Sequence, residues 1–272
     1  MTGPRKSRMT TPRHAVNIPP FTDACTVVDI AVEAEAAGWD GVFLWDHLQW
    51  SLKAALPVHD PWVLLGAVVQ ATERVKVGTL VTPLTRRRVQ IVAKHLLTLD
   101  HLSDGRVIFG VGLGEPPDAD FADFGDEAGA RERGRMLDES LDVLDGLLRG
   151  DRVDHDGEHL HVHARLRPGP VQRPRPPIWV AGVVPNQRPL ERARRWDGVA
   201  PIGQRERLTP DVLASYVGSE LPVGWDVVAG RIEGASAAEY ADAGVTWLTE
   251  STWPTGDWVD EFRTRVAAGP RD

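Results

Sequence analysis

The sequence has 272 residues, a length that suits one barrel domain of about 250 residues or two small domains. Its net charge of -8 disfavours nucleic acid as a partner, and its single cysteine, Cys25, excludes a disulfide within the chain. No apolar stretch approaches the roughly 18 residues of a membrane span, so we expect a cytoplasmic protein that binds neither nucleic acid nor membrane.

Short apolar runs alternate with longer amphipathic runs from residue 15 onward. The basic residues 1–14 before them predict a flexible tail, and residues 15–272 predict a single domain. Strands are predicted at residues 15–18, 41–45, 75–81, 107–111, 178–181, 199–202, 226–229 and 245–248. Helices are predicted at residues 23–37, 89–99, 131–149, 190–196 and 258–266, and three more are predicted to begin at Asp60-Pro61, Thr209-Pro210 and the capping box Ser236–Glu239.

Residues 151–177 interrupt this alternation with many charges, four histidines and several prolines. They predict an excursion, namely a hairpin followed by an extended connection. Eight strand–helix pairs in a chain of this length favour an α/β fold of the (β/α)8 TIM barrel type, with the excursion after the fourth helix, over a doubly wound sheet. In such a barrel, functional groups lie where the strands end at their C-terminal side.

One glycine-rich segment, GVGLGE at residues 110–115, begins in the fourth predicted strand and runs past its end. Alternating glycines there would let a flat or charged ligand approach the backbone closely, although glycines also mark tight turns. The spacing does not match G-x-G-x-x-G and no helix follows at once, which disfavours a Rossmann dinucleotide site.

Several motifs precede and follow this segment in order. They are LDHLSDGR at residues 99–106, AEAAGWDG at 34–41, WDH at 45–47, DPW at 60–62, ATERVKVGT at 71–79, DGEH at 156–159, PVQRP at 170–174, PIWVAG at 177–182 and WDGV at 196–199. Together with the glycine-rich segment they resemble the bacterial luciferase-like monooxygenase family over residues 15–203. The resemblance implies a flavin or deazaflavin ring, FMN or coenzyme F420, in the barrel mouth, where the cofactor supplies the hydride chemistry.

Two side chains are candidates for catalysis. His47 follows the second strand, and an imidazole there could transfer a proton near neutral pH; the alternative is a structural histidine bonded to a loop. Glu115 ends the glycine-rich segment and could act as a general acid, or it could be a solvated loop charge. The resemblance implies a histidine at the active site after this strand in the deazaflavin-using branch, and a glutamate positioned like Glu115 in sugar-phosphate dehydrogenases.

The cofactor-binding candidates lie at the ends of five predicted strands. Thr79 to Thr82 are expected beside the ring, and the resemblance places a non-prolyl cis peptide at Thr79-Leu80. A phosphate group is expected at Gly182, Gly203, Gln204 and Arg205, with backbone amides as donors. The full set is Asp46, Thr79, Leu80, Val81, Thr82, Gly112, Leu113, Gly114, Gly182, Val183, Gly203, Gln204 and Arg205.

Two other charged segments are candidates for a metal site and an anion-binding site. The histidines at positions 155, 159, 161 and 163 predict a polar hairpin face better than a metal site, because metal sites draw ligands from several elements. No metal ligands are therefore predicted. The arginines at 86–88 indicate a solvated loop at the mouth, with recognition of an anionic cofactor tail as the alternative.

The leading hypothesis is a luciferase-like oxidoreductase. Coenzyme F420 would imply hydride transfer, whereas FMN would imply monooxygenation and a separate reductase as partner. The pair Asp46-His47 and Glu115 favour F420 slightly. A metal-dependent barrel hydrolase and a non-catalytic flavin-binding relative remain alternatives. Tryptophans at 39, 45, 50 and 62 predict a small, partly apolar substrate. The apolar face of residues 63–69 would permit the homodimer through helices two and three that the resemblance implies.

Overall fold

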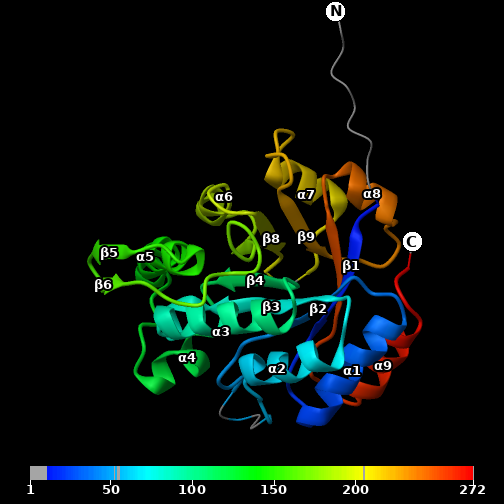
Figure 1. Cartoon of the computed structure of the whole chain (residues 1–272). Helices are drawn as coiled ribbons and strands as arrows, with labels where there is room; N and C mark the ends of the chain where they lie inside the picture. The colour runs from blue at the N-terminus through cyan, green and yellow to red at the C-terminus, as the bar shows by residue number, and fades with distance from the viewer. Residues whose placement is uncertain (1–10, 52, 54–55, 205, 272) are drawn as a thin grey trace, which may run out of the picture.

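Eight parallel strands close into a barrel in a computed structural model that describes residues 11–51, 53, 56–204 and 206–271 (Figure 1). The strands are β1 (Arg13–Ile18), β2 (Gly41–Leu44), β3 (Lys76–Pro83), β4 (Val107–Gly112), β7 (Ile178–Val183), β8 (Gly198–Ile202), β9 (Asp226–Gly230) and β10 (Trp247–Ser251). Their order around the barrel is β1-β10-β9-β8-β7-β4-β3-β2. The predicted (β/α)8 barrel is therefore confirmed.

Helices follow the strands and cover the outside of the barrel. They are α1 (Ala24–Ala36), α2 (Pro61–Ala71), α3 (Val89–Leu102), α5 (Ala130–Arg149), α6 (Gln187–Ala193), α7 (Pro210–Val217), α8 (Ala237–Asp242) and α9 (Trp258–Ala267). The predicted caps form: Asp60 accepts hydrogen bonds from the backbone of Trp62 and Val63, and Ser236 and Glu239 make a reciprocal capping box. The sequence did not predict the short α4 (Pro117–Asp120), nor the 3-10 turns η1 (Leu84–Arg86) and η2 (Ala122–Phe124).

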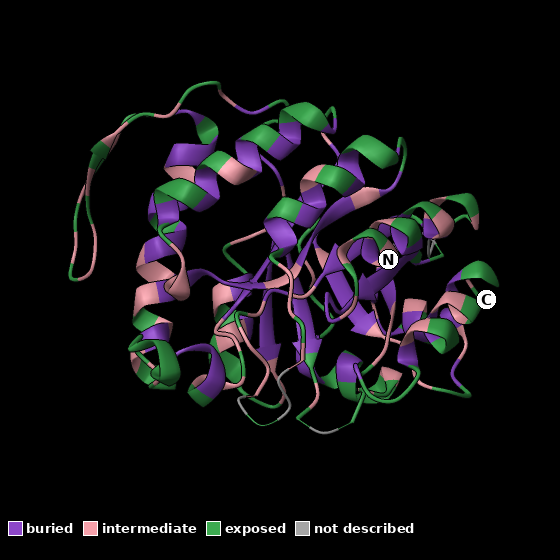
Figure 2. Ribbon diagram, turned by 90° about the horizontal axis from the view of Figure 1, so that it is seen from below, coloured by how far each residue is buried: buried purple, intermediate pink, exposed green. Residues whose placement is uncertain are grey.

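Large aromatic side chains fill the barrel interior. The ring centroids of Phe43 and Trp179 lie 5.2 Å apart, and those of Trp179 and Trp247 lie 5.4 Å apart. All three side chains are fully buried, and small residues such as Ala15 and Ala200 complete the layer. Figure 2 shows the burial concentrated in the strands and on the inner faces of the helices. Because the interior is packed, we look for a ligand at the mouth and not inside the barrel.

The predicted excursion is a two-stranded antiparallel hairpin of β5 (Val153–Asp156) and β6 (His161–Ala164). It projects beside α5, to the left of the barrel in Figure 1. The connection that follows returns the chain to β7 without a helix or strand. The excursion therefore contributes no strand to the barrel.

The barrel begins two residues earlier than the sequence predicted. Arg13 and His14 belong to β1, where Arg13 pairs with Asp226 and its guanidinium lies 4.2 Å from the ring centre of Trp247. Residues 1–10 of the predicted tail lie outside the described residues. In the part of the chain that the structure describes, no helix is both long and apolar enough to cross a membrane.

Strands β3 and β4 approach each other closely where their register shifts, between Thr79 and Thr82. The non-prolyl cis peptide predicted at Thr79-Leu80 lies one residue later, between Leu80 and Val81. A Cβ atom at Gly110 would stand 2.2 Å from the carbonyl oxygen of Thr79, so only glycine fits there. This close contact shapes the floor of the mouth.

Candidate functional site

A cavity of about 370 Å³ opens at the barrel mouth, where β2, β3, β4, β7 and β8 end. This volume falls within the range of small-molecule sites, which is roughly 300–1,000 Å³. The cavity walls are mainly apolar, and His47 provides one of their few titratable groups. The apolar lining includes Leu80, Val81, Leu113, Ala181, Val183 and Ile202.

His47 is held in a fixed orientation at this wall by Asp120, the last residue of α4. Its Nδ1 lies 2.8 Å from Oδ2 of Asp120, while Oδ1 of the same carboxylate accepts the backbone N–H groups of Leu48 and Gln49 at 2.8 and 3.1 Å. A carboxylate acceptor at Nδ1 keeps the proton on that nitrogen. The other nitrogen, Nε2, is therefore the atom available to a ligand in the cavity.

Asp120 is completely buried, and Arg86 supplies its counter-charge at 2.7 Å. Burial alone would raise the pKa of Asp120, but the hydrogen bond with His47 and the positive charge of Arg86 outweigh burial and lower that pKa. The carboxylate thus stays ionised and can stabilise a positive charge on His47. The sequence missed both Asp120 and Arg86, because a four-residue helix has no periodicity and a run of arginines reads as a surface loop.

Asp46 was expected to bind the cofactor; it lines the cavity, and its carboxylate is held by other side chains of the protein. It pairs with Arg86 and Arg87, each at 2.7 Å, and it accepts hydrogen bonds from Thr82 at 2.8 Å and Trp62 at 3.2 Å. The side chain of Arg86 is correspondingly buried, with 2% of it exposed, and that of Arg87 is partly buried, with 17% exposed. The prediction of a solvated arginine loop was therefore wrong for these two residues.

Four residues of β3 were expected beside the ring, and they divide into two pairs. Leu80 and Val81 line the cavity. Thr79 and Thr82 are fully buried instead, with the Thr79 hydroxyl donating to the carbonyl of Gly110 and the Thr82 hydroxyl donating to Asp46. The two threonines fix the shape of the strand end and do not face the cavity.

The glycine-rich segment lines the cavity with Gly112, Leu113 and Gly114. The spacing of its glycines also allows β4 to pack closely against β3, which was not predicted. Gly114 has φ +84°, and a Cβ atom there would lie 2.7 Å from the ring of Pro83. Glu115 also lines the cavity and is exposed at its rim, so its role as a general acid stays a prediction.

The residues expected to bind phosphate are divided between two cavities. Gly182 lines the first, and a Cβ atom there would lie 2.1 Å from Pro189, so this glycine is required by the packing of α6. Val183, which was expected to bind the cofactor, lines both cavities. Gly203 and Gln204 line an adjoining cavity of about 870 Å³. Arg205 lies outside the described residues. The phosphate site therefore stays a prediction.

Aromatic side chains lie beside His47 at the mouth. The ring of Trp50 lies 5.1 Å from that of His47, and the rings of Trp45 and Trp253 lie 5.6 Å apart. Trp253, which is 63% exposed, was not predicted at the mouth. These rings make an apolar rim beside the imidazole.

Two tryptophans expected near the mouth lie elsewhere. Trp39 precedes β2, at the opposite end of the strand, and its indole donates to the carbonyl of Val266 at 2.9 Å. Trp62 lies in the first turn of α2 and is buried, with its ring 5.4 Å from that of His95 and its indole donating to Asp46. Trp39 is distant from the mouth because the two ends of one barrel strand face opposite sides of the fold, whereas Trp62 lies behind the cavity wall at Asp46.

Comparison with known proteins adds three findings. The luciferase-like monooxygenase family matches residues 7–216. An F420-dependent glucose-6-phosphate dehydrogenase from Nocardia farcinica is 38% identical over 138 residues, which cover 49% of this chain and 40% of that protein. A second such dehydrogenase, from Amycolatopsis mediterranei, is 35% identical over 160 residues, 57% of this chain and 46% of that protein. The matches thus span less than half the length of these curated relatives.

Solved structures agree in fold over nearly the whole chain. The coenzyme F420 dependent tetrahydromethanopterin reductase from Methanopyrus kandleri has a TM-score of 0.74 at 16% identity, covering 96% of this chain and 99% of its own. An F420-dependent secondary alcohol dehydrogenase, solved with an F420-acetone adduct, has a TM-score of 0.75 at 17% identity, covering 97% and 100%. At such identities the likeness concerns the fold.

Proposed function

Since this chain belongs to the luciferase-like monooxygenase family, we propose that it is an oxidoreductase that moves a hydride between coenzyme F420 and a small organic substrate. The observation that carries the proposal is the pair of His47 and Asp120. It presents one imidazole nitrogen to an apolar cavity of about 370 Å³ at the barrel mouth.

The cavity fits a flat ring. Its lining is mostly apolar, and at Gly112 a Cβ atom would lie 2.9 Å from Val81 and 3.5 Å from Ala181, so a side chain there would fill part of the slot. A bound F420 ring would supply the acceptor or donor of the hydride. The cleft residues Leu80, Val81 and Leu113 would hold it.

His47 has the geometry of a general acid and base. When a substrate alcohol loses its hydride, its hydroxyl must also lose a proton, and Nε2 of His47 is the group at the wall that can accept it. In the reverse direction the same nitrogen returns the proton to the carbonyl oxygen. Asp120 stays ionised throughout, so it orients the imidazole and stabilises its protonated form.

The pair of His47 and Asp120 also favours F420 over FMN. Proton transfer to and from a substrate oxygen accompanies hydride transfer, whereas a monooxygenase adds an oxygen atom and would need a separate reductase. The preference no longer rests on Asp46 or on Glu115, because the former is tied to arginines and the latter is exposed. The curated relatives that are F420-dependent dehydrogenases support the same choice.

The substrate that suits this mouth is small and apolar. Trp45, Trp50 and Trp253 form the rim beside His47, and such surfaces bind aliphatic or aromatic groups better than phosphorylated sugars. The histidines of the β5–β6 hairpin do not line the cavity, so no observation favours the metal-dependent hydrolase.

The proposed enzyme is a cytoplasmic homodimer. Val63 on α2 is 76% exposed, and Ile91 and Leu102 on the neighbouring α3 are 48% and 49% exposed, which would be a dimer surface. The free and exposed Cys25 suits a reducing compartment. Size-exclusion chromatography of the wild type against Val63→Lys tests the dimer, and a monomeric wild type would contradict it.

The experiment for the cofactor is a fluorescence titration of the purified chain with F420 and with FMN. We expect saturable binding of F420 and weaker binding of FMN; the opposite order would favour the monooxygenase. Turnover of short-chain secondary alcohols with F420 should then fall by about 10²–10⁴-fold in His47→Ala. The matched control is His163→Ala on the exposed hairpin, and equal activity of both variants would indicate a non-catalytic His47.

A further inference from the structure

The tip of the β5–β6 hairpin is docked on α5 by one carboxylate. Glu139 accepts hydrogen bonds from the imidazole of His155 at 2.9 Å and from the backbone N–H groups of His159 and Leu160 at 3.0 and 2.8 Å. A Cβ atom at Gly157 would stand 1.9 Å from the Glu139 carboxylate, so this glycine makes room for the contact. The backbone that carries His159 is therefore fixed relative to α5.

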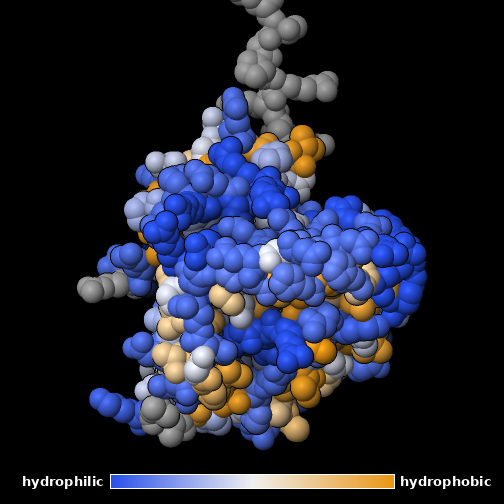
Figure 3. All heavy atoms as spheres, turned by 90° about the vertical axis from the view of Figure 1, so that its left-hand side faces the viewer, coloured by the Kyte–Doolittle hydropathy of each residue, from blue (hydrophilic) through white to orange (hydrophobic). Residues whose placement is uncertain are grey.

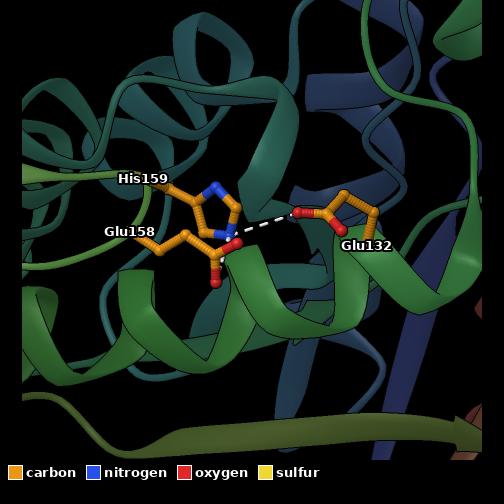
Figure 4. A group of neighbouring side chains, drawn as sticks. All are labelled: Glu132, Glu158 and His159. Carbon is orange, nitrogen blue, oxygen red and sulfur yellow. Dashed lines mark ion pairs between the residues drawn. The ribbon is translucent and has the colours of Figure 1, made fainter.

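This docking brings three metal-ligating side chains from two elements together (Figure 4). Nε2 of His159 lies 3.3 Å from a carboxylate oxygen of Glu132 on α5 and 3.8 Å from one of Glu158 on the hairpin. All three potential ligand atoms lie within 4.8 Å of one another. Metal–ligand bonds of about 2.0–2.2 Å at a tetrahedral ion separate neighbouring donors by roughly 3.3 Å, so small side-chain shifts would complete the set.

The imidazole nitrogen that faces the two carboxylates is buried. Among the described residues it makes no hydrogen bond, although its neighbour Glu132 is within ion-pair distance. A buried polar atom without a hydrogen bond is costly and calls for a partner. From these observations we propose that Glu132, Glu158 and His159 bind a divalent transition metal ion, which links the hairpin tip to the first turn of α5.

Charge at the cluster is compatible with such an ion. Two carboxylates face each other here, and one guanidinium, that of Arg135, pairs with Glu132 and lies 3.9 Å from Glu158. The Arg135 side chain is 54% exposed, so it can swing into solvent at little cost. A divalent cation would neutralise both carboxylates, which the single charge of Arg135 does not.

The donor set indicates the class of metal. One imidazole nitrogen and two carboxylate oxygens suit zinc, cobalt or nickel, whereas calcium and magnesium prefer oxygen ligands alone. Glu158 is 64% exposed, so water can complete the coordination. None of the three residues lines the mouth cavity, and the hairpin side of the molecule is largely hydrophilic (Figure 3). The site would therefore fasten the hairpin and is independent of the proposed reaction.

Calorimetry of the untagged, metal-stripped full chain with zinc tests the proposal. We expect saturable binding of one equivalent that is lost in His159→Ala and retained in His163→Ala, the matched control on the same hairpin. Arg135→Ala should bind zinc at least as tightly as the wild type, because a competing cation has been removed. Zinc should also raise the Tm of the wild type but not of His159→Ala.

Several outcomes would overturn the site. They are the absence of saturable zinc binding to the wild type, its persistence in His159→Ala, its loss in His163→Ala, or weaker binding to Arg135→Ala. A second variant, Glu158→Gln, tests the site in case His159→Ala does not fold, because Glu158 is largely exposed and its replacement should not affect folding. It should keep the wild-type Tm without metal and bind zinc more weakly; unchanged binding would also contradict the proposal.

Discussion

Two clusters in this protein set a histidine against carboxylates, and they differ in how far water reaches them. Behind the barrel mouth, the side chains of Asp46 and Asp120 are 0% exposed and that of Arg86 is 2% exposed. At the hairpin tip, the side chains of Glu132 and Glu158 are 28% and 64% exposed. The same residue types therefore form a fixed framework in one place and an adaptable one in the other.

The difference follows from desolvation. A buried charge that loses its partner cannot turn to water, so each member of the mouth cluster depends on the others. An exposed carboxylate can exchange an arginine for water or a metal ion at little cost. The mouth cluster can thus hold His47 in one orientation, whereas the tip cluster can accept different cations.

The largest effect is expected for Asp46→Ala, which breaks the buried framework. It would leave the guanidinium groups of Arg86 and Arg87 without their shared carboxylate, at a cost of about 3–5 kcal/mol in the free energy of unfolding. Urea unfolding measures this loss. The matched control is Asp154→Ala on the hairpin, whose partner Arg152 is exposed, and it should leave the midpoint unchanged. Equal losses in both variants would contradict the comparison.

The next effect is kinetic and concerns Asp120→Asn. The amide removes the charge that stabilises protonated His47 and fixes its tautomer, so kcat should fall at least about tenfold, up to the 10²–10⁴-fold range of a lost general base. The pH–rate profile should change as well, which a purely structural role would not cause. Asp123→Asn is the control, because Asp123 contacts the same loop through an exposed hydrogen bond from the side chain of Gln49. A normal kcat and an unchanged pH profile in Asp120→Asn would mean that Asp120 contributes to stability and not to catalysis.

A smaller effect is expected in acid. The pKa of Asp120 is lower in the folded state than in the unfolded state. The ionised Asp120 therefore stabilises the fold fully at pH values above the ordinary aspartate pKa of about 3.9. This stabilisation is lost as the pH falls through the lower pKa of the folded state. The pKa of Asp154 is lowered too, mainly by its hydrogen bond with Arg152, but this pair is exposed. In about 1 M salt, where the Debye length is about 3 Å, the contribution of Asp154 should vanish and that of Asp120 should persist. Urea midpoints of Asp120→Asn and Asp154→Asn between neutral pH and pH 3 would show this; equal salt sensitivity would contradict it.

Much of the fold was predictable from the sequence because its signals are local. Helix starts are marked by the capping residues Asp60, Thr209 and Ser236, and strands are marked by their apolar runs. The hairpin is marked by the interrupted alternation of strands and helices at residues 151–177. The position of His47 at the mouth follows from the end of β2 alone.

The partners of these residues were not predictable, because they come from distant segments. Asp120 reaches His47 across 73 positions, and Arg86 and Arg87 reach Asp46 across 40 and 41. Trp253 joins the rim from the end of the barrel, more than 200 positions from Trp45. Burial decides whether a polar side chain can contact a ligand or instead holds other parts of the protein in place, and a single sequence does not carry that information for Asp46, Thr79 or Thr82.

The smallest effects separate two glycines, one from each region. In Gly110→Ala behind the mouth, the new methyl group would meet the rigid backbone of Thr79, at a cost of about 1–3 kcal/mol. In Gly157→Ala at the hairpin tip, it would meet the end of the Glu139 side chain, which can rotate away. We therefore expect Gly157→Ala to change the unfolding free energy by less than about 0.5 kcal/mol, as for most surface substitutions.

Loss of the Glu139 contacts in Gly157→Ala should nevertheless loosen the hairpin locally, because His159 and Leu160 would lose the acceptor of their backbone N–H groups. Hydrogen exchange would then speed up at these amides and stay unchanged in the barrel strands. A large global loss in Gly157→Ala would mean that the hairpin is part of the cooperative core. The cluster at the hairpin tip would then be as rigid as the cluster at the mouth, although water reaches it.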